Sequence, residues 1–277
     1  AKQPTPMKPK RFKYIYLLLC MALCITTVSR GYYLKHHTNE GNPFSRAINT
    51  IIPEAIPGIN HVIDDSLSDL EETKKMERTI ERFMAQWEIK GASLAIMKNG
   101  KLLYSKGFGW ADKEQGIRTD VRHIFRIASL SKLITATGIM KLCEQGRLSL
   151  GDRVFGADGI LNDSLFRNIR DKRIEKITVE HLLRHQGGYS IRSGDPLFCS
   201  VSVAKQLGIA PPVGFDDMVR YAAETRLRYE PGSSNLYSNL GYVVLTKVIE
   251  KASGLPYESF IRDSILSPAG CHDMHIG

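Results

Sequence analysis

Hydrophobic and polar residues follow two different periods along the chain beyond its first quarter. From Leu70 to Trp87 apolar residues recur every three or four positions among charged ones, which predicts an amphipathic helix. Residues 92–97 and 101–108 are rich in β-forming side chains and flank Asn99-Gly100. That dipeptide suits a tight hairpin, because both of its residues tolerate positive φ. We therefore expect a helix followed by a β-hairpin.

The rest of the chain has the apolar spacing of helices. Four segments carry it: 129–144, 179–184, 215–226 and 239–253. Because two strands alone cannot bury a face stably, the hairpin needs further strands or a packed helix. The pattern predicts an α+β fold, with a helical subdomain and an antiparallel sheet of which these residues hold only the first hairpin. We expect the other strands beyond residue 277 or from another molecule.

The amino-terminal quarter has a different character. Residues 1–13 form a basic segment, and the uncharged apolar run at 14–28 lies within a segment, 14–30, that we interpret as a signal peptide or membrane anchor. The basic residues before the run outnumber those after it, so the remainder is expected to be exported to the periplasm or cell envelope. Residues 31–68 resemble a linker, and 69–277 form the predicted globular domain.

Composition and charge exclude several functions. The chain has 277 residues, 43% of them hydrophobic and 24% charged, as in a folded globular protein. Of the net charge of +9, seven units fall within residues 1–46, so the body is nearly neutral and no nucleic-acid partner is expected. The five cysteines and eight histidines show no metal-ligand spacing, so we expect no metal and no cofactor. We interpret Cys143 as a core residue and the histidines as solvated or capping residues.

Two segments place a serine three residues before a lysine. Ser129 and Lys132 stand at the start of a predicted helix, where both side chains lie on one face and the amine can take the hydroxyl proton. Ser202 and Lys205 have the same spacing, but a proline- and glycine-flanked context without the Phe125-to-Ala128 segment before them. We therefore choose Ser129 as the candidate nucleophile.

Three blocks give this spacing a context. They are F-R-I-A-S-L-S-K at 125–132, H-L-L-R-H-Q-G-G at 181–188 and Y-E-P-G-S-S-N-L-Y-S-N-L-G-Y at 229–242. In these blocks the chain resembles the serine β-lactamase and penicillin-binding-protein superfamily, in which S-x-x-K marks the nucleophile. The Tyr-x-Asn triplet at 237–239 resembles the branch of class C β-lactamases, D-alanyl-D-alanine carboxypeptidases and related esterases. The resemblance extends over roughly residues 69–277.

The resemblance implies a serine hydrolase of the cell envelope. Ser129 would attack an amide or ester carbonyl and become acylated, Lys132 and Tyr237 would share the proton transfers, and Asn239 would bind the substrate's amide side chain. The substrate would be a β-lactam, a D-Ala-D-Ala peptide of peptidoglycan or a small ester. The base could be the phenol, made more acidic by nearby cations, or the amine, made less basic by burial. The sequence leaves both open.

The family's third motif, Lys-Thr-Gly or His-x-Gly on a strand, is expected farther along the chain. His275-Ile276-Gly277 has the right letters, but it lies too close after the Tyr-x-Asn helix. We therefore interpret the chain as the amino-terminal portion of such a protein, truncated before its third motif and inactive by itself. The alternative is a non-catalytic penicillin sensor or ligand-binding module.

Overall fold

The computed structural model describes residues 73–192 and 194–276, and the chain divides into two compact units, one ending at His123 and the other beginning at Ile124. The predicted basic segment, the signal or anchor at 14–30 and the linker at 31–68 lie outside the described residues. Within the described residues, no helix has the length and hydropathy needed to cross a bilayer.

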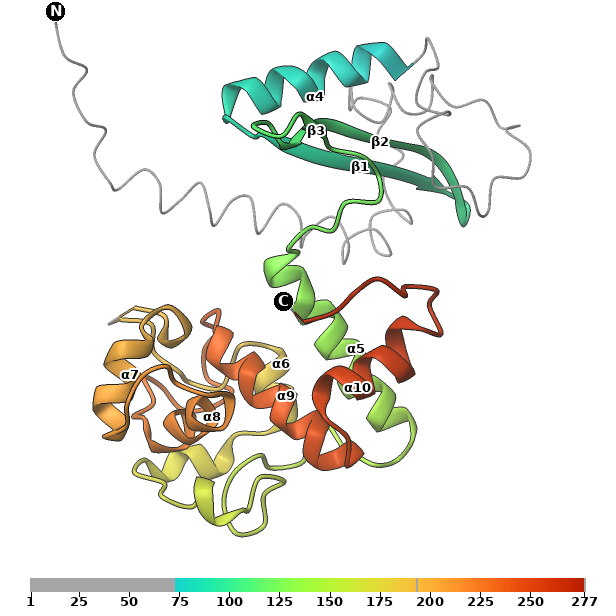
Figure 1. Ribbon diagram of the computed structural model, residues 1–277. Coiled ribbons are helices and arrows are strands. Elements are labelled where there is room, and N and C mark those ends of the chain that lie inside the picture. Colours follow the sequence, from blue (N-terminus) through green and yellow to red (C-terminus); the bar gives the residue numbers. More distant parts are fainter. Residues whose placement is uncertain (1–72, 193, 277) are drawn as a thin grey trace, which may run out of the picture. The chain divides into compact units, whose positions relative to one another are not determined.

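The described part of the first unit, residues 73–123, combines one helix with a small sheet. Helix α4 (Lys74–Gln86) lies along one face of strands β1 (Gly91–Lys98) and β2 (Lys101–Asp112), as Figure 1 shows. The strands are antiparallel, and the predicted turn forms with φ of 52° at Asn99 and 73° at Gly100. Each adopts the left-handed conformation that such a turn requires. The prediction of a helix and hairpin is confirmed.

The sheet also has a third strand that the sequence did not indicate. Strand β3 (Ile117–Arg118) pairs antiparallel with β2, so the order is β1-β2-β3. Its two residues are too few for a period-two pattern, which is why the pattern gave no sign of it. Met84 on α4 and Phe108 on β2 are both buried. Glu77 on α4 accepts a hydrogen bond from the Tyr104 hydroxyl at 2.9 Å.

The second unit is helical and carries the larger hydrophobic core. Its main elements are the 3-10 turn η3 (Ala128–Leu130), α5 (Ser131–Glu144), α6 (Val179–Leu183), η6 (Pro196–Phe198), α7 (Ser200–Leu207), α8 (Phe215–Glu224), α9 (Asn239–Ser253), α10 (Tyr257–Ile261) and the π-helical turn η7 (Arg262–Leu266). Two further 3-10 turns are η4 (Ser164–Phe166) and η5 (Lys172–Lys176). The four predicted helical segments are all confirmed, with ends shifted by at most two residues. The segment around Ser202, to which we assigned no helix, forms α7.

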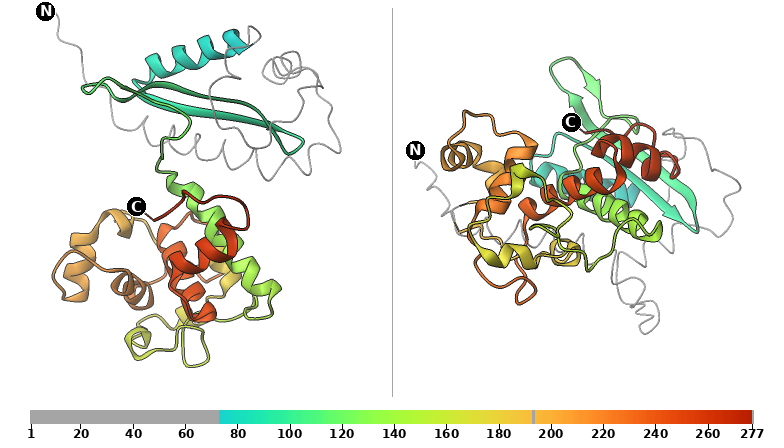
Figure 2. Two further views of the ribbon diagram at one scale, coloured as in Figure 1. Left: turned by 45° about the vertical axis from the view of Figure 1, so that its right-hand side comes forward. Right: turned by 90° about the horizontal axis from the view of Figure 1, so that it is seen from below.

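Helix α9 occupies the middle of this unit. It packs against α5, α6, α8 and α10 (Figures 1 and 2), and Val244, Leu245, Val248 and Ile249 on it are fully buried. A helix contacted on several sides needs apolar residues on several faces, and α9 has them. Gly138 on α5 allows α5 and α10 to approach closely, because an added Cβ would lie 2.8 Å from a methyl group of Ile261 on α10.

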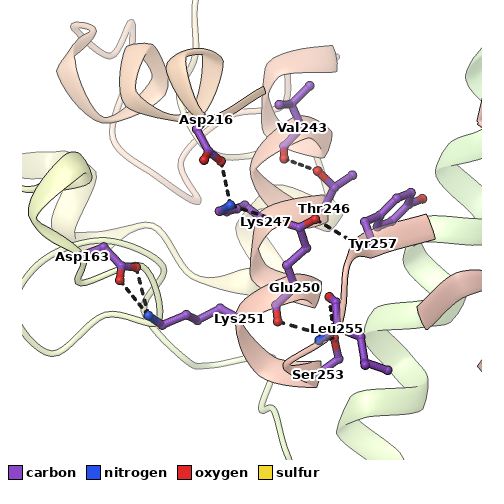
Figure 3. Close-up of polar contacts among 10 residues, drawn as sticks. All are labelled: Asp163, Asp216, Val243, Thr246, Lys247, Glu250, Lys251, Ser253, Leu255 and Tyr257. Atoms are coloured by element: carbon purple, nitrogen blue, oxygen red, sulfur yellow. Dashed lines mark hydrogen bonds and ion pairs between the residues drawn. The ribbon is translucent and has the colours of Figure 1, made fainter. Parts of the chain in front are cut away.

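Ion pairs fix the carboxyl-terminal half of α9 to its surroundings. Figure 3 shows Lys247 between Asp216 at 2.7 Å and Glu250 at 3.1 Å, and Lys251 beside Asp163 at 2.8 Å. Glu250 also accepts the Tyr257 backbone N–H at 3.1 Å, which joins α9 to the start of α10. The helix is therefore held at this end by charged partners and in its middle by apolar packing.

Candidate active site

Ser129 and Lys132 come together where η3 passes into α5. Ser129 lies in the 3-10 turn and is exposed, and Lys132 lies in the first turn of the helix. The Lys132 Nζ atom is 3.5 Å from the Ser129 Oγ atom. Ala128, just before the serine, has φ of +45°, a conformation costing a non-glycine residue about 1 kcal/mol. The chain therefore makes a strained turn to present the hydroxyl beside the amine.

Tyr237 reaches this pair from 108 residues farther along the chain. Its phenol donates a hydrogen bond of 2.7 Å to the Ser129 Oγ atom. The residue after it, Ser238, is the N-cap of α9, and its hydroxyl accepts the Gly241 backbone N–H at 3.0 Å. Because the cap fixes where α9 begins, it also fixes the position of Tyr237, which directly precedes the cap. The Lys132 Nζ atom lies 4.9 Å from the centre of the Tyr237 ring.

Asn239 is the fourth residue of the group. As the first residue of α9, it accepts a hydrogen bond from Lys132 Nζ at 2.6 Å through Oδ1. Its Nδ2 atom donates to Asp195 Oδ2 at 2.7 Å. All four residues selected from the sequence, Ser129, Lys132, Tyr237 and Asn239, are thus joined by hydrogen bonds within the second unit.

The second serine–lysine pair lies elsewhere. Ser202 and Lys205 are both exposed on α7, which lies away from α5 in every view (Figures 1 and 2). The tyrosine, the asparagine and the first pair share one site, and α7 contributes nothing to it. The structure therefore places Ser129, and not Ser202, beside the tyrosine and the asparagine, and the choice of nucleophile stays a prediction.

His185, which we interpreted from the sequence as solvated or capping, lies against Tyr237 in the folded chain. The residue is partly buried, and its ring lies 4.6 Å from that of Tyr237 and 5.1 Å from that of Tyr242. Its Nδ1 atom accepts the Ser238 backbone N–H at 3.2 Å. Burial, and then the positive charge of Lys132, lower the pKa of His185 to about 4. The imidazole is therefore neutral at pH 7 and positions the Tyr237 segment. The interpretation is correct for His181, which caps α6.

The segment around His185 runs beside the one that carries Tyr237. The carbonyls of His185, Gln186 and Gly188 accept the backbone N–H groups of Leu236, Gly232 and Arg228 at 3.0, 2.9 and 2.8 Å. Gly188 has φ of +89°, and an added Cβ would lie 2.6 Å from the Tyr229 carbonyl oxygen. Glycine is therefore required where the two segments pass. Gly188 is the last residue of the block H-L-L-R-H-Q-G-G, so this block already contained the required glycine.

Asp195 is the second residue that the sequence did not indicate. It follows no motif that we singled out, and it reaches Asn239 across 44 residues of sequence. Among the described residues, no group of three His, Cys, Asp or Glu side chains is placed to hold a metal ion. Cys143, predicted to be a core residue, is partly buried and packs against the core, as expected.

The fold is α+β, and its second unit holds a serine hydroxyl beside an amine and a phenol, an arrangement that can activate a hydroxyl as a nucleophile. The family model described as Beta-lactamase matches residues 76–277, and the chain belongs to this family. The suspected relation to serine β-lactamases and penicillin-binding proteins is confirmed.

Individual relatives support the same assignment. Penicillin-binding protein 4* of Bacillus subtilis (strain 168) is 30% identical over 205 residues, which cover 73% of this chain and 41% of that protein. The octameric penicillin-binding protein homologue from Pyrococcus abyssi is 34% identical with a TM-score of 0.58, over 71% of this chain and 42% of that one. EstCE1, a hydrolase with promiscuous acyltransferase activity, is 27% identical with a TM-score of 0.59, over 72% and 51%. The chain spans about two fifths to one half of the lengths of these relatives.

Proposed function

We propose that the protein is a serine hydrolase of the cell envelope that cleaves an amide or ester through a covalent acyl-enzyme. The observation that carries the proposal is the 2.7 Å hydrogen bond between Tyr237 and Ser129, with the Lys132 amine 3.5 Å from the same oxygen. A serine hydroxyl is a weak nucleophile unless a neighbouring group takes its proton. Here two such groups contact it.

The reaction begins with attack of the Ser129 Oγ atom on the substrate carbonyl carbon. The hydroxyl proton passes to Lys132 in its neutral amine form or to Tyr237 in its phenolate form, an oxygen–carbon bond forms, and the carbonyl oxygen becomes an oxyanion. When the tetrahedral intermediate collapses, the bond to the leaving nitrogen or oxygen breaks, and the same groups return the proton to the leaving atom. Water then attacks the ester on Ser129 and releases the acid.

Asn239 is proposed to contact the substrate as well as Lys132. Its Oδ1 atom accepts from the amine, and one hydrogen of its Nδ2 atom points to Asp195. An amide nitrogen carries two hydrogens, so the second can bind a carbonyl oxygen of the substrate. The residue would then orient the amine and the substrate together.

The substrate class comes from the family. We propose a β-lactam, a D-Ala-D-Ala peptide of peptidoglycan or a small ester, because the relatives include a penicillin-binding protein and a hydrolase with acyltransferase activity. We further propose that residues 14–30 direct export or anchor the protein at the membrane, based on the basic segment followed by an apolar run. The nearly neutral body favours no nucleic-acid partner.

Covalent labelling with a fluorescent penicillin tests the proposal. The test uses protein that also contains the expected third motif, because we interpret residues 1–277 as inactive by themselves. That protein should be labelled, Ser129→Ala should abolish labelling, and Ser202→Ala should be labelled like the parent protein. Release of the label within minutes indicates a hydrolase, whereas permanent labelling indicates a sensor or an inhibited peptidase. Absence of labelling with penicillin and with an activated ester would contradict the proposed function, and loss of labelling in Ser202→Ala would overturn the choice of nucleophile.

A further inference from the structure

Asp195 uses its two carboxylate oxygens for two different contacts. Oδ1 accepts the Leu197 backbone N–H at 3.0 Å and so caps η6, the short 3-10 turn that follows. Oδ2 accepts the Nδ2 atom of Asn239 at 2.7 Å. The residue is partly buried, and its second contact reaches the first residue of α9. The cap needs only one oxygen, so the second contact requires its own explanation.

The second contact selects one of two orientations of the Asn239 amide. A side-chain amide has an oxygen that accepts and a nitrogen that donates, and turning it by 180° exchanges the two. An ionised carboxylate has only acceptors, so it favours the orientation in which Nδ2 faces Asp195. In that orientation Oδ1 faces Lys132, as the 2.6 Å bond shows. In the other orientation a donor would face the amine.

We propose that Asp195 is a positioning residue that aims the Lys132 amine at Ser129 through the amide of Asn239. The chain of contacts runs from Asp195 to Asn239, from Asn239 to Lys132 and from Lys132 to the Ser129 hydroxyl. This inference rests on the proposed function, because the amine is aimed at the proposed nucleophile.

The amide also keeps the negative charge away from the amine. A carboxylate in direct contact with Lys132 would form an ion pair and hold its proton. Asn239 instead gives the amine a neutral oxygen, and the Asp195 charge lies one side chain farther away. The arrangement fixes the direction of the amine without a direct charge pair.

Two variants of Asp195 test the proposal while keeping the cap. Asp195→Asn and Asp195→Ser each retain an oxygen that can accept from the Leu197 N–H, but both lack the second carboxylate oxygen. We expect each to lower the rate of Ser129 acylation by about tenfold or more, as loss of a charged hydrogen-bond partner does. The matched control is Asp163→Asn, because Asp163 contacts a lysine on the same helix but outside the site. Its rate should stay within about twofold of the parent.

A double-mutant cycle separates positioning from a structural effect. If Asp195 acts only through Asn239, then Asp195→Asn should change the rate less than about twofold when Asn239→Ala is already present. An equal loss in both backgrounds would mean that Asp195 acts by another route, and the proposal would be wrong. Near-parental rates in the single Asp195 variants would overturn it as well.

NMR of the protein before any acylation tests the Asp195–Asn239 contact independently of activity. In protein labelled with 15N in its asparagine side chains, the two Nδ2 proton signals of Asn239 are identified by their absence from Asn239→Ala. Asp195→Asn and Asp195→Ser should shift these signals, whereas Asp163→Asn should not. Unshifted signals would contradict the proposal. A protein that shows the shift but is never labelled at Ser129 would refute the proposed function while leaving the Asp195–Asn239 contact established.

Discussion

The two ends of helix α9 both carry lysine contacts, but the partners differ in charge. Near its carboxyl-terminal end, Lys247 lies between two carboxylates and Lys251 contacts a third (Figure 3). At its amino-terminal end, Lys132 contacts the amide oxygen of Asn239 and the ring of Tyr237. Among the described residues, no carboxylate pairs with Lys132.

This difference separates a lysine held by carboxylates from one held by an amide oxygen and a hydroxyl oxygen. Burial opposes the charged form of Lys247, but Asp216 and Glu250 together raise its pKa above the ordinary value. A lysine held in this way keeps its proton. Lys132 has uncharged oxygens as partners, one of which belongs to the proposed nucleophile Ser129. We therefore expect the carboxyl-terminal end of α9 to stabilise the fold and its amino-terminal end to form the candidate site.

The sharpest test of this comparison replaces each lysine in turn. Lys132→Ala should lower the rate of Ser129 acylation by about 1000-fold, since loss of a general base or acid typically costs that much. Lys247→Ala should leave the rate within about twofold and lower the free energy of unfolding by about 1 kcal/mol. Stopped-flow labelling and urea unfolding measure the two effects. Equal acylation rates for Lys132→Ala and Lys247→Ala would contradict the distinction between the two ends of α9.

The next largest effect on the acylation rate is expected from loss of the Tyr237 hydroxyl. Tyr237→Phe removes the hydroxyl that contacts Ser129 and should lower the acylation rate by about 100-fold, with little change in stability because the side chain is 42% exposed. Tyr257→Phe is the control, because its hydroxyl lies 2.7 Å from that of Thr135. That variant should lose about 1 kcal/mol of stability and keep its rate. A parental rate in Tyr237→Phe would leave Lys132 as the base.

A smaller effect is expected from His185 and concerns the pH dependence of the free energy of unfolding. Its pKa of about 4 in the folded protein lies below the ordinary 6.5. The unfolded chain therefore binds the proton more readily, and stability is lost as the pH falls from about 6.5 to about 4. Between pH 7 and pH 4 the parent should lose about 2 kcal/mol more than His185→Gln.

Urea unfolding at the two pH values measures this difference. His272→Gln serves as the control because His272 is exposed, and it should show the same pH dependence as the parent. An identical pH dependence for His185→Gln and the parent would mean that His185 titrates normally.

The smallest effect belongs to the surface pair at the other end of α9. Asp163 and Lys251 are 44% and 43% exposed, so their ion pair is screened by water and salt. Asp163→Asn should reduce the free energy of unfolding by about 0.5 kcal/mol at low salt and by less at 1 M salt. A loss of several kcal/mol, or one that salt does not reduce, would show that this pair does more than stabilise the surface.

Periodicity predicted the elements that are long enough to show it. The α9 helix begins and ends where the pattern placed it, and the Asn99-Gly100 turn joins the two expected strands. Strand β3 has two residues and helix α7 has eight, so neither offers enough positions for a clear period. Boundaries also moved where local bonding decided them, as at η3, which precedes α5.

The sequence predicted those residues of the candidate site that lie within the two motifs S-x-x-K and Tyr-x-Asn. Ser129 and Lys132 are neighbours on one turn, and Tyr237 and Asn239 follow from a second motif. His185 and Asp195 act through contacts with residues 53 and 44 positions away, and no local pattern indicates such contacts. Of the two, His185 lay inside a motif that we quoted, but its burial and its backbone partner became visible only in the folded chain.

The account depends on acylation of Ser129, and mass spectrometry of the acylated protein tests this most directly. The protein is treated with a β-lactam or an activated ester, digested, and its modified peptide is sequenced. We predict one adduct per chain, located on Ser129 and absent from Lys132→Ala on the same timescale. An adduct on Ser202 or on a surface lysine, or equal modification of Lys132→Ala, would contradict the account.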